Sequence, residues 1–246
     1  MMNRTIQQAL LSAILVMGSF TLPVWAETDD DLEALAPAES RYTSPEYGFT
    51  IARADDWLMF TDKDVVKRSL IGLIIESGGV VEWQDGLALL SRYPLESSLT
   101  QLSPRVQVEV YHIEPPHTAD EASQWVAEQF LSAMQEDPEF GGQVKSKLSE
   151  VTINGVLWRT AGFQTKLSLP DPNTGDPRIM HASVDFYVHA SGDRLFLLQC
   201  IARATDAPRF RRDFDSMIHS VSVRDVQANN NTPSSGRLAQ LVRALP

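Results

Sequence analysis

Four of the five histidines lie in two short stretches, and these stretches hold the side chains best suited to chemistry near neutral pH. The first stretch reads His-Ile-Glu-Pro-Pro-His over residues 112–117. Imidazole and carboxylate groups suit a transition metal, so His112, Glu114 and His117 form a candidate metal site. The alternative is a solvated corner between a strand and a helix, with no bound ion.

The second stretch is the expected strand 179–190. Its polar residues share one strand parity: His181, Ser183, Asp185, Tyr187 and His189. Positions four apart on a strand lie about 13 Å apart, so His181, Asp185 and His189 cannot share one ion or form a relay by themselves. Partners must come from other strands, Gln199 and Arg203 being candidates. We expect a wet sheet face or the wall of a ligand groove, with His181, Asp185, Tyr187 and His189 facing the ligand.

Signatures of the common catalytic classes are missing from the sequence. It has no G-x-S-x-G, H-E-x-x-H or C-x-x-C motif and no Walker loop. The single cysteine, Cys200, lies in the apolar run LFLLQCIA, which favours a buried and inert thiol. We therefore expect no catalytic residues and no cofactor, apart from the candidate transition metal.

The amino terminus has the pattern of a secretory signal peptide. Arg4 precedes an apolar stretch over residues 9–22, and the small residues Val24 and Ala26 occupy the −3 and −1 positions. A membrane-spanning helix needs about 20 apolar residues, and this run is shorter and broken by a glycine and a proline. The pattern predicts a signal peptide over residues 1–26, cleavage between Ala26 and Glu27, and a periplasmic or secreted protein without stable membrane insertion.

The charge balance argues against two classes of partner. The formal net charge is −11 at pH 7, and residues 1–26 contribute one arginine and no acid to it. Nucleic acids and anionic lipid surfaces both need a basic face. Six acidic residues fall within residues 27–39, so we expect a disordered acidic leader over 27–40.

Alternation and helical periodicity predict the order of elements in a single domain over residues 41–225. Strands are expected at 47–54, 87–93, 105–113, 147–153, 156–167, 179–190 and 194–203, and the first of them is expected to be the entry strand of the sheet. Helices are expected from about 62 to 77, from 119 to 136 and from 208 to 220. The Asn154-Gly155 pair predicts a tight hairpin, and Thr118 with Glu121 forms a capping box.

Four consecutive hairpin-linked strands imply an antiparallel sheet, so the predicted fold class is α+β, with helices packed on the faces of the sheet in an α/β/α sandwich. Three segments resemble landmarks of the PsbP-like group: YGFTI followed by DDW over residues 47–57, VTING followed by WR over 151–159, and FDSMIHSVSV over 214–223.

The PsbP-like group includes the extrinsic photosystem II subunit, a fungal Ran-binding protein and many exported bacterial proteins. The resemblance spans nearly all of residues 41–223, and it implies the fold and a role in binding or assembly. The chain departs from the pattern at Ala54, where the group usually has proline, and its segment 62–77 is longer than in the plant subunit. It is thus more similar to an uncharacterised exported bacterial branch.

The carboxyl terminus, residues 226–246, is expected to be a disordered tail. Its last eleven residues, GRLAQLVRALP, match a translation of the 5′ end and D-arm of a bacterial tRNA gene, so the reading frame is expected to run into such a gene. A small amphipathic helix is the alternative.

Together these features predict an exported, periplasmic and non-catalytic binding or assembly module whose partner is an unknown envelope protein. The alternative function is a metal-dependent or otherwise uncharacterised enzyme. It would use either the His112, Glu114 and His117 corner or the strand face from His181 to His189.

Overall fold

The computed structural model describes residues 40–69, 80–94, 102–136, 143–170 and 177–224. The signal peptide, nearly all of the acidic leader and the tail lie outside the described residues. The strands are β1 (Arg41–Ser44), β2 (Phe49–Ala52), β3 (Leu58–Phe60), β4 (Val81–Ser91), β5 (Arg105–Ile113), β6 (Gln143–Ile153), β7 (Val156–Pro170), β8 (Pro177–Ser191), β9 (Arg194–Arg203) and β10 (Ser222–Val223). The helices are α2 (Lys63–Ser69), α4 (Ala119–Glu136) and α5 (Ala207–His219).

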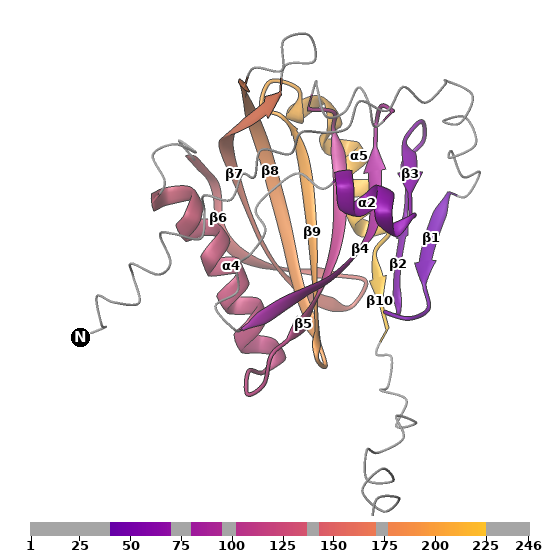
Figure 1. Cartoon of the computed structure of the whole chain (residues 1–246), viewed down its shortest axis with the longest axis vertical. Coiled ribbons are helices and arrows are strands. Elements are labelled where there is room, and N and C mark those ends of the chain that lie inside the picture. The colour runs from indigo at the N-terminus through magenta and orange to yellow at the C-terminus, as the bar shows by residue number, and fades with distance from the viewer. Residues whose placement is uncertain (1–39, 70–79, 95–101, 137–142, 171–176, 225–246) are drawn as a thin grey trace, which may run out of the picture.

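The strands form two antiparallel sheets. A seven-stranded sheet has the order β3-β4-β5-β9-β8-β7-β6, and a three-stranded sheet has the order β1-β2-β10. Helix α4 packs on one face of the large sheet, while α5 and the small sheet cover part of the other face (Figure 1). The predicted α+β class with helices on both faces of an antiparallel sheet is therefore confirmed.

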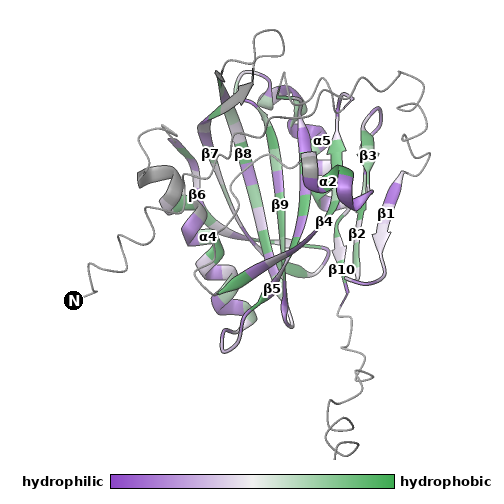
Figure 2. Cartoon of the chain, in the orientation of Figure 1, coloured by the Kyte–Doolittle hydropathy of each residue, from purple (hydrophilic) through white to green (hydrophobic). Residues whose placement is uncertain are grey.

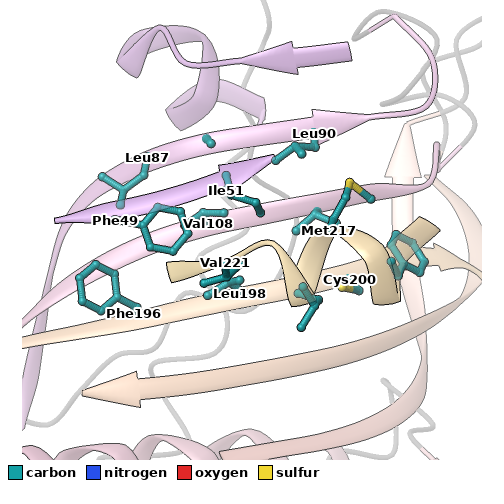
Figure 3. Close-up of a cluster of buried hydrophobic side chains, with 14 of the residues drawn as sticks. Phe49, Ile51, Leu87, Leu90, Val108, Phe196, Leu198, Cys200, Met217 and Val221 are labelled. Carbon is teal, nitrogen blue, oxygen red and sulfur yellow. The ribbon is translucent and has the colours of Figure 1, made fainter. Parts of the chain in front are cut away.

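The face of the large sheet beneath α5 carries the first core. Phe49 and Ile51 of β2 and Met217 of α5 lie against Val108 of β5 and Leu198 of β9 (Figure 3). All five side chains are buried. The small sheet thus covers the part of the first core that α5 does not cover.

The opposite face carries the second core, beneath α4. Ala122 and Val126 of α4 pack against Phe163, Val184 and Phe186 of β7 and β8. Strand β8 contributes side chains to both faces of the sheet, because successive side chains point to opposite sides of a strand. Hydrophilic and hydrophobic residues alternate along β8 in Figure 2, whereas β9, next to it, is mostly hydrophobic.

Local signals place the ends of several elements. At the start of α4, Thr118 Oγ1 accepts a hydrogen bond from the Glu121 backbone N–H at 3.3 Å, and the Thr118 backbone N–H donates to Glu121 Oε2 at 2.9 Å. The expected capping box is therefore present. Asn154 and Gly155 both have positive φ, 49° and 82°, as a tight hairpin turn between β6 and β7 requires.

The opening segment was expected to enter the main sheet, and this is wrong. Strand β2 pairs with β1 and β10 in the small sheet, and only β3, after Trp57, joins the large sheet beside β4. Strands β1, β3 and β10, of two to four residues, are absent from the expected elements.

The remaining elements lie close to their expected positions. Strand β4 begins at Val81 instead of residue 87 and β6 at Gln143 instead of 147, because bulges interrupt their alternation. The expected helix over 62–77 is present as α2 up to Ser69, and the rest lies outside the described residues. Among the described helices, none is both long and apolar enough to cross a membrane.

Candidate ligand-binding face

The odd-numbered side chains of β8 share the α5 side of the large sheet with side chains of β6 and β7. The registers of the three strands place opposite residues on the same face. Near the hairpin end, the shared surface is apolar and belongs to the first core. Farther along it is polar, and we call this part the polar face: Gln143, Lys145, Ser146, Ser149, Thr160, Gly162, Gln164, Lys166, His181, Ser183 and Asp185.

Tyr187 and His189 were expected on a ligand face, and the structure places them at its apolar border. The His189 ring lies 5.1 Å from the Trp158 ring, and its Nδ1 donates to the Leu157 carbonyl at 2.9 Å. Burial raises the pKa of Tyr187, and the charges of Cys200 and Asp185 add to the effect. These contacts tie both residues to the core, so His181 and Asp185 are the predicted residues that the polar face itself contains.

Asp185 lies against the backbone of the neighbouring strand. It is directly opposite Gly162 of β7, where an added Cβ would come within 2.3 Å of Asp185 Oδ1 and 3.0 Å of Ser146 Oγ. Real Cβ atoms do not approach an oxygen that closely, so this carboxylate position depends on a glycine at residue 162. The carboxylate is therefore recessed into the sheet surface.

Lys145 reaches across β7 to the same place. Its Nζ donates a hydrogen bond to Ser183 Oγ at 2.7 Å and lies 3.5 Å from Asp185 Oδ1. The three side chains therefore connect β6 and β8 over Gly162. Sequence reasoning missed Lys145, because the strand was expected to begin at residue 147 and a bulge disturbs the alternation before that residue.

A serine beside a lysine is a nucleophile and base in some hydrolases, which need an accessible hydroxyl and a neutral amine. Ser183 is only 3% exposed. Lys145 is also paired with Asp185, so its amine is not dedicated to the serine. The arrangement therefore fixes a charged surface and does not resemble an activated nucleophile.

Helix α5 borders the polar face with a second ion pair. Arg211 Nε lies 3.2 Å from Asp215 Oδ1, one helical turn away. The charge of Asp215 raises the pKa of Arg211, and Asp185 and Tyr187 act in the same direction. The charges of α5 and β8 thus belong to one connected electrostatic environment.

Gln199 and Arg203 were expected to face Asp185 or His181, and this is wrong. Residues 191 and 194 pair directly, so the turn holds two residues, and this register places Cys200 opposite Asp185 and Gln199 opposite Phe186. Gln199 and Arg203 consequently lie on the α4 side of the sheet.

At the predicted metal corner, His112 is the last but one residue of β5, and Glu114 and His117 follow in the loop. His112 Nδ1 lies 3.8 Å from Asp193 Oδ2, and the His117 backbone N–H donates to the Glu114 carbonyl at 3.1 Å. In the described part of the chain, no group of three or more His, Cys, Asp or Glu side chains is placed to hold a metal ion. The transition-metal site stays a prediction.

A buried polar row on β5 is a feature that sequence reasoning missed. Arg105, Gln107, Glu109 and Tyr111 alternate with valines, which suggests a wet face, yet each of the four is at most 5% exposed. They lie on the α4 side of the sheet, where β5 is flanked by β4 and β9. The sequence does not reveal that β5 pairs with β9, nor that this face of β5 is covered.

Glu109 is the acid within this row. Its Oε2 accepts from the Tyr111 hydroxyl at 2.9 Å, its Oε1 accepts from Gln199 Nε2 at 2.9 Å, and the Trp83 side chain also donates to it. Burial raises the pKa of Glu109 because the charged carboxylate is desolvated, and the three hydrogen bonds partly offset this. Such a perturbed group is a candidate functional residue, although structural networks perturb pKa values too.

No protein-family model and no curated protein matches this chain. Solved structures with a similar arrangement include cyanobacterial PsbP from Synechocystis, at 14% identity and a TM-score of 0.42, covering 75% of this chain and 91% of that one. LpqN of Mycobacterium tuberculosis, involved in cell envelope biogenesis, is 12% identical with a TM-score of 0.43, covering 74% of this chain and 88% of LpqN.

A Bacteroides thetaiotaomicron protein is 13% identical with a TM-score of 0.39, covering 76% of this chain and 49% of that one. Cyanobacterial PsbP, one of these similar structures, bears the name of the group that the sequence motifs resemble.

Proposed function

We propose that this chain is an exported binding module that acts in the periplasm or outside the cell, and that the polar face is its binding surface. The polar face is the observation that carries the proposal. It brings hydroxyl, amide and charged groups of three adjacent strands to one side of a sheet whose other parts are packed into two cores.

The positions of these groups favour binding over structural use alone. Gln143, Ser149 and His181 are exposed, while Thr160 and Gln164 are half-buried, so a partner can reach this part of the face. Backbone pairing on both sides holds β7 and β8 rigid, and sites built on rigid strands position their groups better than sites on loops. The signal-peptide pattern over residues 1–26 supports export.

Site-specific photo-crosslinking in cells tests the proposal. A photoreactive amino acid replaces Gln164 on the polar face or, as the matched control, Glu128 on the exposed side of α4. We expect one discrete crosslinked envelope protein from position 164 and none from position 128. Fractionation and the mass of the mature chain test export, with cleavage expected between Ala26 and Glu27.

Equal crosslinking from both positions would contradict the polar face as the binding surface. No partner from position 164, combined with turnover of a substrate by the purified protein, would favour the enzyme alternative. Elemental analysis of the purified protein tests the transition metal that His112, Glu114 and His117 would hold. A bound ion that is lost in His112→Ala would place the metal at that corner.

A further inference from the structure

The polar face carries charges of both signs, but its carboxylate is already engaged. Asp185 is paired with Lys145 and is recessed over Gly162. At the border of the face, Asp215 is paired with Arg211. The acidic groups are thus neutralised by neighbours from the same chain.

Two basic side chains on the face have no such acid. Lys166 of β7 and His181 of β8 lie directly opposite each other, so their side chains project from the same face. His181 is exposed and Lys166 is half-buried. No ion pair joins either side chain to an acidic residue within the described ranges.

The surroundings of this pair suit a carboxylate-bearing ligand. Gln164 lies two residues before Lys166 on the same side of β7, directly opposite Ser183 of β8. A carboxylate that meets Lys166 can therefore also accept hydrogen bonds from a neighbouring amide, and charge-assisted bonds of this kind are the stronger ones. The polar face thus presents donors with a net positive charge.

We propose that the polar face binds an acidic peptide segment of a partner protein, with Lys166 and His181 as the main contacts. This inference rests on the proposed function and names the chemistry of its partner. A short segment fits better than an anionic membrane, because a membrane surface would also face the rest of a chain whose net charge is −11. Salt screens charges beyond about 8 Å, so a narrow acidic segment experiences mainly the local basic patch.

Fluorescence anisotropy with synthetic peptides tests the inference on the full mature chain. The probes are a labelled peptide of alternating Glu and Ser, and a second peptide with Lys in place of each Glu. We expect the acidic peptide to bind and the basic peptide not to bind. Lys166→Glu should weaken binding about fivefold or more because it reverses the charge of a contact, and His181→Glu should weaken it by a similar factor because it adds a negative charge that repels the acidic peptide.

Arg41→Glu is the matched control, since Arg41 is an exposed arginine of β1 in the small sheet and the charge change is the same as in Lys166→Glu. It should leave the affinity within twofold of the wild type, a change below about 0.4 kcal/mol. Circular dichroism checks that every variant is folded. Equal weakening by Arg41→Glu would show attraction to the overall charge and would overturn the inference.

Three other results decide against an acidic peptide. Binding of the basic peptide overturns it, and so does failure of the acidic peptide to bind while Gln164 still crosslinks a partner. If the acidic peptide fails to bind while Gln164 still crosslinks a partner, the proposed binding module stands and only the chemistry of its partner is wrong. Binding of vesicles containing anionic phospholipid, but not of the acidic peptide, would assign the face to a membrane surface instead.

Discussion

At the scale of single residues, the buried row on β5 shows how tertiary context changes the meaning of a polar side chain. Arg105 is fully buried, and its Nη1 donates to the Ser69 carbonyl at 3.0 Å, which ties β5 to the end of α2. Burial lowers the pKa of Arg105 to about 10. Glu109 and Tyr111 share a hydrogen bond in the same row. A polar strand face is therefore part of the interior.

Glu109 should make the stability of the protein depend on pH. Burial raises its pKa in the folded state, so between the unfolded and folded pKa values the folded chain binds more protons than the unfolded chain. The free energy of unfolding should therefore decrease as pH rises through this interval, by about 1.4 kcal/mol for each unit of the shift. Glu109→Gln cannot ionise, so the variant should lack this decrease.

Urea unfolding of the wild type and of Glu109→Gln from about pH 4 to about pH 8 measures the effect. This interval begins near the ordinary pKa of glutamate and extends above it. The slope with pH is diagnostic, because altered hydrogen bonds to Tyr111 or Gln199 shift all values equally. Glu82→Gln, at an exposed position of the adjacent strand β4, is the control. Parallel curves for wild type and Glu109→Gln would show that folding does not change the pKa of Glu109.

At the scale of elements, the β6–β7 turn is also a brace for α5. Asn154 Nδ2 donates to the His219 carbonyl at 2.8 Å and to the Val221 carbonyl at 2.7 Å. These carbonyls lie at the end of α5 and just before β10. One side chain thus connects the hairpin of the large sheet to the element that leads into the small sheet.

Replacing Asn154 should separate the turn geometry from the brace. Asn154→Gly keeps a residue suited to φ of 49° but removes both hydrogen bonds, at an expected cost of about 1–2 kcal/mol. Asn154→Ala loses the same bonds and adds strain at positive φ, so it should be less stable than Asn154→Gly. Thermal or urea unfolding measures both, with Thr152→Ala on β6 as the control.

If Asn154→Gly were as stable as the wild type, the two hydrogen bonds would not contribute to the attachment of α5. If Asn154→Ala matched Asn154→Gly, the positive φ would not limit the residue at this turn. Either result would separate the two roles that the contacts of Asn154 suggest.

At the scale of the whole molecule, β9 lies between two cores, one on each face of the large sheet. Phe196, Leu198 and Cys200 face the first core, while Leu195 and Leu197 face the second. Successive side chains of β9 are therefore buried by different layers, one on each side of the sheet. Loss of either layer would expose one side of β9.

Cys200 should report this global order. The thiol is 2% exposed, and burial raises its pKa far above the usual range, with added effects of Asp185 and Asp215. Its reaction with a chromogenic aromatic disulfide should be about a hundredfold slower than that of an exposed thiol introduced by Ser149→Cys on β6. Absorbance over time measures both rates in one protein, and equal rates would contradict a closed first core.

Features set by local pattern were predicted from the sequence more completely than features set by contacts between distant segments. Long strands, both major helices, the Asn-Gly turn and the capping box follow from local pattern and local hydrogen bonding, and these were predicted from sequence. The short strands β1, β3 and β10 were not predicted, since their few residues did not stand out as an alternating run. Asp185 and His181 were identified as face residues, but their neighbours Lys145 and Lys166 were not.

The sequence by itself determined the periodicity of the elements, the antiparallel α+β class and the side of β8 on which its polar residues lie. Tertiary structure alone decided that β2 lies outside the large sheet and that β5 lies between β4 and β9, where Glu109 is buried, and it set the register in which Lys145 meets Asp185 over Gly162. The physical reason is that side-chain alternation is a local property, whereas strand order and register arise from packing between segments far apart in the chain.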